Sequence, residues 1–256
     1  MAFDAAAEKY DRFMGRYTPL LATEMADRAG VVAGMRVVDV GCGPGGLVSE
    51  LCARVGAENV AGIDPAAQFV AACSARNPGA DIRVGGAEEL PWADSSFDAA
   101  LSSLAVGFFG DPSAGLAEMV RVTRPGGAVA ACMWDIADGG MNMLRIFWSA
   151  ARAVRPDTRG ESAMPGTSNG DLVARFQRAG LVDVAGTALV VSASYAGFGD
   201  FWEPFTYGIG PSGSFLVSLP ASEQEQVRAE CRAMLPDGPF SLEARAWYAQ
   251  GVVPTA

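Results

Sequence analysis

Histidine is absent from this chain, and lysine occurs once, at Lys9. Enzymes that move a hydride to or from a nicotinamide usually pass the accompanying proton through a histidine or a tyrosine–lysine pair. The single lysine precedes the first predicted strand, so it has no place at the end of a strand, where such a pair would act. The absence of histidine and the position of the single lysine therefore disfavour a nicotinamide-dependent dehydrogenase.

Other features that the sequence lacks limit where the protein works and what it contacts. No apolar run approaches the roughly 18 residues of a membrane helix, and residues 1–4 lack the basic and apolar regions of a signal peptide. The five cysteines form no CxxC pair, which indicates reduced thiols and predicts a cytoplasmic protein. A net charge of −10 repels nucleic acid and anionic lipid, so neither is an expected partner. No metal site is expected, and the oligomeric state stays open.

The first half of the chain alternates between short apolar segments and segments of helical periodicity. Strands are predicted at about 35–40, 59–64, 81–84, 97–104 and 128–134, and helices at about 4–30, 46–55, 66–76 and 112–122. Residues 124–127 are predicted to form a turn before the fifth strand. Alternation at this spacing predicts a parallel sheet with helices on both faces.

The second half has a different pattern. Helices are predicted at about 141–154, 171–179 and 222–235, with Ser222 as the N-cap of the last, and strands at about 182–195 and 242–252. A dense group of aromatic residues lies between the last two strands. We therefore expect a small helical cap inserted before the closing strand.

The most informative stretch follows the first predicted strand. Residues 37–46 read Val-Val-Asp-Val-Gly-Cys-Gly-Pro-Gly-Gly, which predicts a buried strand and a tight turn into a helix. Glycine lacks a Cβ, so the backbone can turn sharply there and approach a ligand closely. The start of the helix adds free N–H groups and a positive dipole end. This stretch predicts a nucleotide-type cofactor site.

Two cofactors fit the glycine turn equally well. Gly41-x-Gly43-x-x-Gly46, followed by Asp64 about 20 residues later, satisfies the dinucleotide fingerprint. The spacing Asp39-x-Gly41-x-Gly43-x-Gly45 resembles the first motif of class I S-adenosylmethionine (SAM) dependent methyltransferases. The turn alone leaves both open.

Later segments resemble further motifs of the same methyltransferase family, and they follow in its order. Gly62-Ile63-Asp64 is similar to the second motif, residues 88–98 (EELPWADSSFD) to its "eeLPFpDgSFD" stretch, and residues 118–127 (EMVRVTRPGG) to its "E-x-x-RVLKPGG" signature. Residues 10–17 resemble the N-terminal helix of the ubiquinone/menaquinone-biosynthesis-like (methyltransferase type 11) group. The sequence is therefore similar to this group of small-molecule methyltransferases.

The resemblance implies an α/β, Rossmann-like fold with a seven-stranded, mostly parallel sheet of order 3-2-1-4-5-7-6. It implies methyl transfer from SAM to a small organic acceptor, with release of S-adenosylhomocysteine; the aromatic residues of the second half extend this expectation to an aromatic or lipophilic acceptor. A SAM-binding enzyme of other chemistry, such as a cyclase or decarboxylase, and a non-catalytic SAM-binding protein remain open. The expected division is an N-terminal helical segment over the cofactor site (1–30), a SAM-binding core (31–196), a helical cap (197–240) and the last core strand (241–256).

Positions around the cofactor also follow from the resemblance. Asp39, Gly41, Gly43 and Gly45 are expected around the methionine portion of SAM. Asp64, next to Pro65, is expected to accept hydrogen bonds from both ribose hydroxyls, because an ionised carboxylate is a pure acceptor. The alternative role for Asp64 is the N-cap of the following helix.

The remaining cofactor contacts are less sharply defined. Ser103 and Leu104 lie where the family's backbone approaches the methionine amino group, and Tyr10 and Arg16 are expected at its carboxylate or, alternatively, on an exposed helix face. At the adenine the sequence departs from the family's Gly-Asp-Ala and reads Gly-Gly-Ala-Glu at residues 85–88. We expect the backbone N–H of Ala87 to meet the ring, and Glu88 either to replace the missing acid or to be a solvated helix start.

The acceptor side is a hypothesis built on aromatic residues. An apolar pocket that excludes water is expected from Trp134, Phe147, Trp202, Phe205 and Tyr207. The alternative is that these side chains form the core of the cap. The sequence assigns no catalytic residue; Tyr207, Glu203 and Asp135 are candidate bases on position alone, and an acceptor carbon or phenolate needs none.

Overall fold

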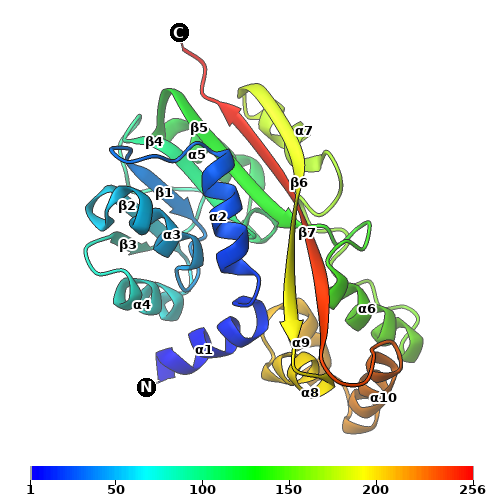
Figure 1. Ribbon diagram of the computed structural model, residues 1–256. Coiled ribbons are helices and arrows are strands. Elements are labelled where there is room, and N and C mark those ends of the chain that lie inside the picture. Colours follow the sequence, from blue (N-terminus) through cyan, green and yellow to red (C-terminus); the bar gives the residue numbers. More distant parts are fainter. Residues whose placement is uncertain (1, 256) are drawn as a thin grey trace.

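The computed structural model describes residues 2–255, and side chains from residue 8 onward. A seven-stranded sheet with the order β3-β2-β1-β4-β5-β7-β6 runs through the molecule (Figure 1). Its strands are β1 (Val37–Val40), β2 (Val60–Asp64), β3 (Asp81–Val84), β4 (Phe97–Ser103), β5 (Thr123–Trp134), β6 (Val182–Tyr195) and β7 (Phe240–Val252). Only β7 is antiparallel to its neighbours among these pairings. The predicted fold class and strand order are confirmed.

Helices cover both faces of the sheet. They are α1 (Ala2–Met14), α2 (Thr18–Arg28), α3 (Gly46–Val55), α4 (Ala67–Arg76), α5 (Pro112–Val122), α6 (Asn142–Val154), α7 (Asp171–Arg178), α8 (Phe198–Trp202), α9 (Gly210–Ser218) and α10 (Ala221–Ala233), with 3-10 turns η1 (Ala57–Asn59), η2 (Val106–Phe108) and η3 (Glu203–Tyr207). The strands β1 and β2 are buried along their whole length. Continuous apolar strands are what a parallel sheet covered on two faces requires. No helix within residues 2–255 has the length and apolar character needed to cross a bilayer.

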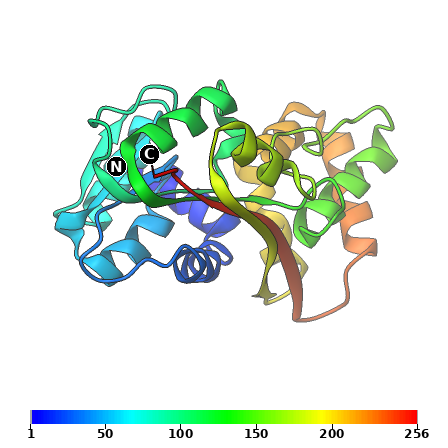
Figure 2. The same ribbon diagram turned by 90° about the horizontal axis from the view of Figure 1, so that it is seen from above.

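The segment between β6 and β7 is helical, as predicted, and holds α8, η3, α9 and α10. The view from above shows this segment (orange) and the strands β1 to β3 (blue to cyan) at opposite ends of the molecule, with the long strands β5 to β7 between them (Figure 2). One apolar cluster runs from α2 and α3 into the helical segment and includes Leu21, Leu47, Phe147 and Phe205. The helical segment and the sheet core are therefore parts of one packed unit.

The segment predicted to be helical at 4–30 forms two helices, because Pro19 lacks an N–H and is tolerated only in the first turn of a helix, which α2 provides. Two local predictions were wrong. Ser222 is not an N-cap: α10 begins at Ala221 after Pro220, without a side-chain cap. The turn predicted at 124–127 lies within β5, where it forms an irregularity against β4 between the pairs Phe97–Thr123 and Ala99–Ala128.

A buried tyrosine pair joins the bend between α1 and α2 to the end of β6. The hydroxyls of Tyr17 and Tyr195 are 2.8 Å apart, and both side chains are almost fully inaccessible to solvent. Each hydroxyl is the other's hydrogen-bond partner. Removing one leaves a buried polar group without a partner, which costs more than the bond itself contributes.

We predict that Tyr195→Phe lowers the free energy of unfolding by about 1–3 kcal/mol, because the Tyr17 hydroxyl loses its buried partner. The double variant Tyr17→Phe/Tyr195→Phe is expected to lose less than the sum of the two single changes. Urea denaturation measures both. Tyr207→Phe, which removes a hydroxyl from an exposed contact with Glu203, is the matched control. Additive effects of the two buried changes would contradict the pairing.

Candidate functional site

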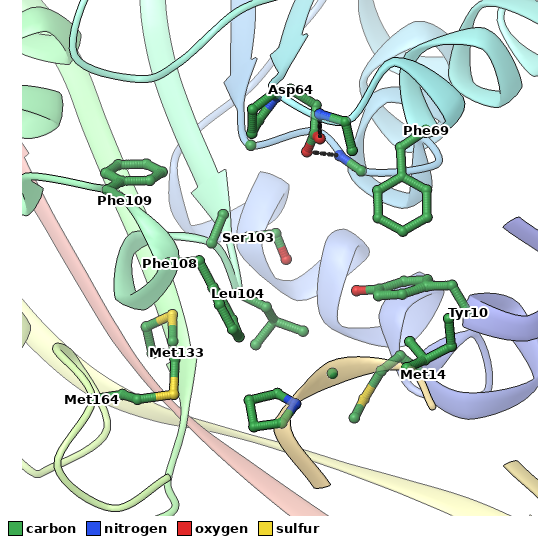
Figure 3. Close-up of a pocket in the computed structure, with 18 of the residues that line it drawn as sticks. Tyr10, Met14, Asp64, Phe69, Ser103, Leu104, Phe108, Phe109, Met133 and Met164 are labelled. Carbon is green, nitrogen blue, oxygen red and sulfur yellow. Dashed lines mark hydrogen bonds between the residues drawn. The ribbon is translucent and has the colours of Figure 1, made fainter. Parts of the chain in front are cut away.

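A cavity of about 590 Å³ lies at the carboxyl ends of β1, β2 and β4, covered by α1 and residues 208–211. Ligands of open α/β sheets bind at this edge. Figure 3 shows Asp64 and Phe69 at one end, which we term the Asp64 end, and Met133 and Met164 at the opposite end, which we term the far end. Ser103 and Leu104 lie between the two.

The turn after β1 is fixed against the end of β2. The N–H groups of Gly41 and Cys42 both donate to the carbonyl of Ile63, at 2.8 and 3.0 Å. Gly41 has a φ of +78°, and a Cβ at this position would collide with the side chain of Ala105. Only glycine suits both the left-handed backbone and the close approach to Ala105.

Asp64 lies at the end of β2 and lines the cavity. Its Oδ2 accepts from the N–H of Gly43 and its Oδ1 from the N–H of Ala66, both at 2.9 Å. Burial raises the pKa of this carboxyl, and the two backbone hydrogen bonds oppose that rise. The residue preceding α4 is Ala66, so Asp64 is not the N-cap of that helix. Each carboxylate oxygen keeps a free lone pair for a ligand hydroxyl.

Asp39 is the second buried acid near the turn. It is 1% exposed, and its Oδ1 has no hydrogen-bond partner among the described residues. Burial, followed by the nearby Cys73 and Asp64, raises its pKa well above the usual range. A buried acceptor without a partner is rare in folded proteins and calls for a missing donor.

Most of the residues predicted to contact the cofactor come together around this cavity. Its lining includes Tyr10, Gly41, Gly43, Asp64, Pro65, Ala87, Glu88, Ser103 and Leu104, and also Trp134 from the predicted acceptor side. Burial, and then the charges of Asp64, Asp11 and Asp39, raises the pKa of Tyr10. The hydroxyl of Tyr10 therefore stays a hydrogen-bond donor at neutral pH.

Glu88 lies over the position where the family's acid is missing. A Cβ built on Gly86 would be 2.7 Å from Oε2 of Glu88, so this carboxylate occupies the space next to Gly86. Its Oε1 accepts from the N–H of Asp111 at 3.1 Å. The side chain is held at the cavity and is not freely solvated.

Three expected cofactor residues lie outside the cavity lining: Arg16, Gly45 and the buried Asp39. Arg16 forms an ion pair with Asp200 (2.9 Å), donates to the carbonyl of Ser194 (2.9 Å) and stacks on the ring of Tyr195. These partners hold its guanidinium at the end of β6 and not at the cavity. Gly45 faces α4, because a Cβ there would lie 2.8 Å from the sulfur of Cys73.

Of the predicted acceptor residues, only Trp134 is in the described cavity lining. Phe147 and Phe205 stack with their ring centroids 4.5 Å apart, and Phe205 packs on Phe13, which lines the cavity. Trp202 is buried beside Phe205. These side chains form an apolar layer behind the cavity wall, as the alternative interpretation had it.

None of the three candidate bases lines the cavity. Glu203 and Tyr207 form a surface contact with each other and with Arg12. Asp135 is fully buried and forms an ion pair with Arg245. None of them is therefore placed to reach a ligand in this cavity.

Several lining residues were missed by the sequence analysis. Phe69 packs edge-on against Tyr10 at 5.6 Å, and Met133, Met164, Phe108 and Glu161 line the far end. Phe69 and Met133 lie within predicted elements, at the start of α4 and near the end of β5, so their positions at the carboxyl edge of the sheet gave a usable signal. The loop 155–170 has no motif and gave none.

Comparisons with known proteins agree with this geometry. Residues 38–131 match the family described as a methyltransferase domain. The chain is 36% identical over 128 residues to malonyl-[acyl-carrier protein] O-methyltransferase of Erwinia billingiae, covering 50% of each chain. It is 39% identical over 130 residues to demethylmenaquinone methyltransferase of Renibacterium salmoninarum, covering 49% of this chain and 54% of that protein. The chain thus spans about half the length of these curated relatives.

A solved structure shares the whole fold. The YcgJ protein of Bacillus subtilis has a TM-score of 0.60 at 19% identity, covering 92% of this chain and 98% of its own. At this identity the likeness concerns the fold alone. The strand order and the matches over residues 38–131, a segment described as a methyltransferase domain, confirm the predicted resemblance to class I methyltransferases.

The buried Asp39 predicts a pH-dependent stability. An unfolded Asp loses its proton near pH ~3.9, whereas folded Asp39 keeps its proton to higher pH because its pKa is raised. Protons are then lost from the unfolded state first, so this residue lowers the free energy of unfolding as pH rises through that interval.

We predict that Asp39→Asn, in the ligand-free protein, raises the free energy of unfolding relative to wild type, and by more at pH 8 than at pH 5. Urea denaturation at both pH values measures the difference. Asp157→Asn, at an exposed aspartate, is the control whose effect is subtracted. An Asp39→Asn variant that is less stable than wild type at pH 8 would show that the charge is compensated.

Proposed function

We propose that this protein transfers a methyl group from SAM to a small, neutral, largely apolar acceptor. One observation carries the proposal: the carboxylate of Asp64 is held at the cavity by the N–H groups of Gly43 and Ala66, with lone pairs left for ligand hydroxyls. A vicinal pair of ribose hydroxyls fits this arrangement. The position of Asp64 at the end of β2 is the one that the family resemblance assigns to the ribose.

The cavity offers partners for the other parts of SAM. On this proposal the hydroxyl of Tyr10, which lines the cavity, donates to the methionine carboxylate, and the ammonium of SAM supplies the donor that the buried Oδ1 of Asp39 lacks. Glu88 beside Gly86 supplies an acceptor for an adenine amino group. When bound, SAM supplies a methyl group that is already activated by its sulfonium. The chain's own residues bind, orient and exclude water.

Alignment is the main catalytic task that this site can perform. Holding two reactants in line contributes effective molarities of roughly 10⁵ M or more in good cases. The described lining holds no histidine, lysine or arginine that would move a proton with a hydride. Methyl transfer therefore suits this residue supply better than a dehydrogenase reaction does.

The acceptor is expected to be neutral. The relatives named above act, by their names, on malonyl-[acyl-carrier protein] and on demethylmenaquinone. Malonyl carries a carboxylate, and the described residues that line the cavity include no arginine or lysine to pair with one. The far end is formed largely by methionine, phenylalanine and leucine side chains. An apolar ring or chain fits such a lining.

Calorimetry and mass spectrometry together test the proposal. SAM and S-adenosylhomocysteine are expected to bind the purified protein, and NAD is not. Incubation with SAM and a panel of neutral and anionic acceptors should yield a neutral product heavier by one methyl group. A rearranged product without added mass would support a cyclase, and tight SAM binding without any turnover would support a non-catalytic SAM-binding protein. Binding of NAD in place of SAM would overturn the proposal.

We predict that Asp64→Ala weakens binding of S-adenosylhomocysteine by roughly 100-fold or more, since two hydrogen bonds to a charged acceptor are lost and each contributes about 1.5–3 kcal/mol. Isothermal calorimetry measures the loss. Asp94→Ala, at a surface side chain that is 78% exposed, is the matched control and should bind like wild type. Circular dichroism of both variants checks the fold. Undiminished affinity of a folded Asp64→Ala protein would remove Asp64 from the ribose site.

A further inference from the structure

One carboxylate lies at the far end of the cavity, away from the acids of the Asp64 end. Glu161 lines the cavity and is 6% exposed. It belongs to the same turn as Met164, whose N–H donates to the carbonyl of Glu161 at 3.0 Å. Figure 3 shows Met164 beside Met133, opposite Asp64. No motif, relative or earlier argument gives this residue a role.

Half of the Glu161 carboxylate is used by the protein. Its Oε2 accepts from the indole Nε1–H of Trp148 at 2.7 Å. Its Oε1 has no hydrogen-bond partner within residues 8–255 and is not among the completely buried, unpartnered polar atoms of that range, so it keeps some exposure in a residue that lines the cavity. No described arginine or lysine lies within ion-pair distance. Burial raises the pKa of this carboxyl.

The loop that carries Glu161 is firmly held. Thr167 donates its hydroxyl to the carbonyls of Ser162 and Met164, and the N–H of Gly166 donates to Asp171 at 2.6 Å. The ring of Trp148 packs over Gly160. The carboxylate is therefore placed before any ligand arrives, which is what a specificity contact requires.

A buried acceptor that faces an apolar space is costly unless a ligand donates to it. Apolar side chains that line the same cavity, such as Met133, Ile136 and Leu144, carry no oxygen acceptor. An ammonium has three donors and would leave some of them unpaired, whereas a hydroxyl has one donor and satisfies Oε1 alone. The arrangement thus favours a neutral molecule with a single hydroxyl.

We propose that Glu161 is the specificity-determining residue of the acceptor site, and that the acceptor is an apolar molecule, such as a substituted phenol, whose hydroxyl donates to Oε1. This proposal rests on the proposed methyl transfer, because it assigns the far end to the acceptor. A site built to bond a hydroxyl rejects the analogue that lacks one, since the site's own polar group is then left unpaired.

The test compares two probes that differ only in the donor. Calorimetry with 4-butylphenol and 4-butylanisole, on the protein saturated with S-adenosylhomocysteine, is expected to give at least tenfold tighter binding of the phenol. Glu161→Gln keeps an oxygen for Trp148 and turns its amide N–H toward the cavity, so the preference for the phenol should disappear. Trp148→Phe removes the donor to Oε2 but keeps the carboxylate, so the preference for the phenol should remain, which separates ligand contact from loop support.

Equal affinities of the two probes for the wild-type protein, or binding of neither, would overturn the inference. An unchanged phenol preference in Glu161→Gln, or tighter binding of 4-butylbenzylamine than of the phenol, would also overturn it. The wild-type comparison needs no variant, so the test holds even if Glu161→Gln does not fold. Binding of S-adenosylhomocysteine alone is measured first: its absence counts against the methyltransferase proposal, whereas its presence without phenol discrimination counts against Glu161 only.

Discussion

The attachment of the β1–α3 turn to the end of β2 is the constraint on which the site depends. Two N–H groups of the turn donate to Ile63, and a third, from Gly43, donates to Asp64. The glycines let the backbone come close enough for these bonds, and the bonds in turn fix the carboxylate of Asp64 at the cavity. The parallel pairing of β1 with β2 sets the distance between the turn and the end of β2. The register of the sheet therefore determines the geometry of the ligand site.

The cavity exists because helix α1 bridges two distant parts of the chain. On one side Asp11 forms an ion pair with Arg76 of α4, and on the other Phe13 packs on Phe205 of η3. Figure 1 shows α1 between α4 and the α8–α9 region. Exposed ion pairs contribute little stability, so the apolar Phe13 contact and the burial of Met14 hold the helix in place. The wall of the cavity is thus supplied by elements near both ends of the sequence.

Features that depend on a few neighbouring residues could be predicted from the sequence. The sheet order and the glycine turn with Asp64 depend on local patterns that the family shares, and they could be predicted. Contacts across the chain could not: Arg16 meets Asp200, which lies 184 positions later, and nothing near Arg16 marks that partner. The aromatic residues Phe147 and Phe205 were recognisable as apolar but not as the layer behind the wall, because periodicity does not say which surface a helix covers. Glu161 lies in a loop, where side-chain direction follows from long-range packing.

Three acids beside the site have pKa values that burial raises: Asp39, Asp64 and Glu161. The described cavity lining contains no arginine or lysine whose positive charge would stabilise the ionised form of these acids. A buried acid without a positively charged partner lowers the free energy of unfolding, and such groups occur commonly at functional sites. On the function proposed here the cost has a use, because SAM carries a sulfonium charge that its demethylated product lacks. Whichever of these acids is ionised would attract the charged donor more than the spent product, and the loss of that attraction on methyl transfer would promote release of the product.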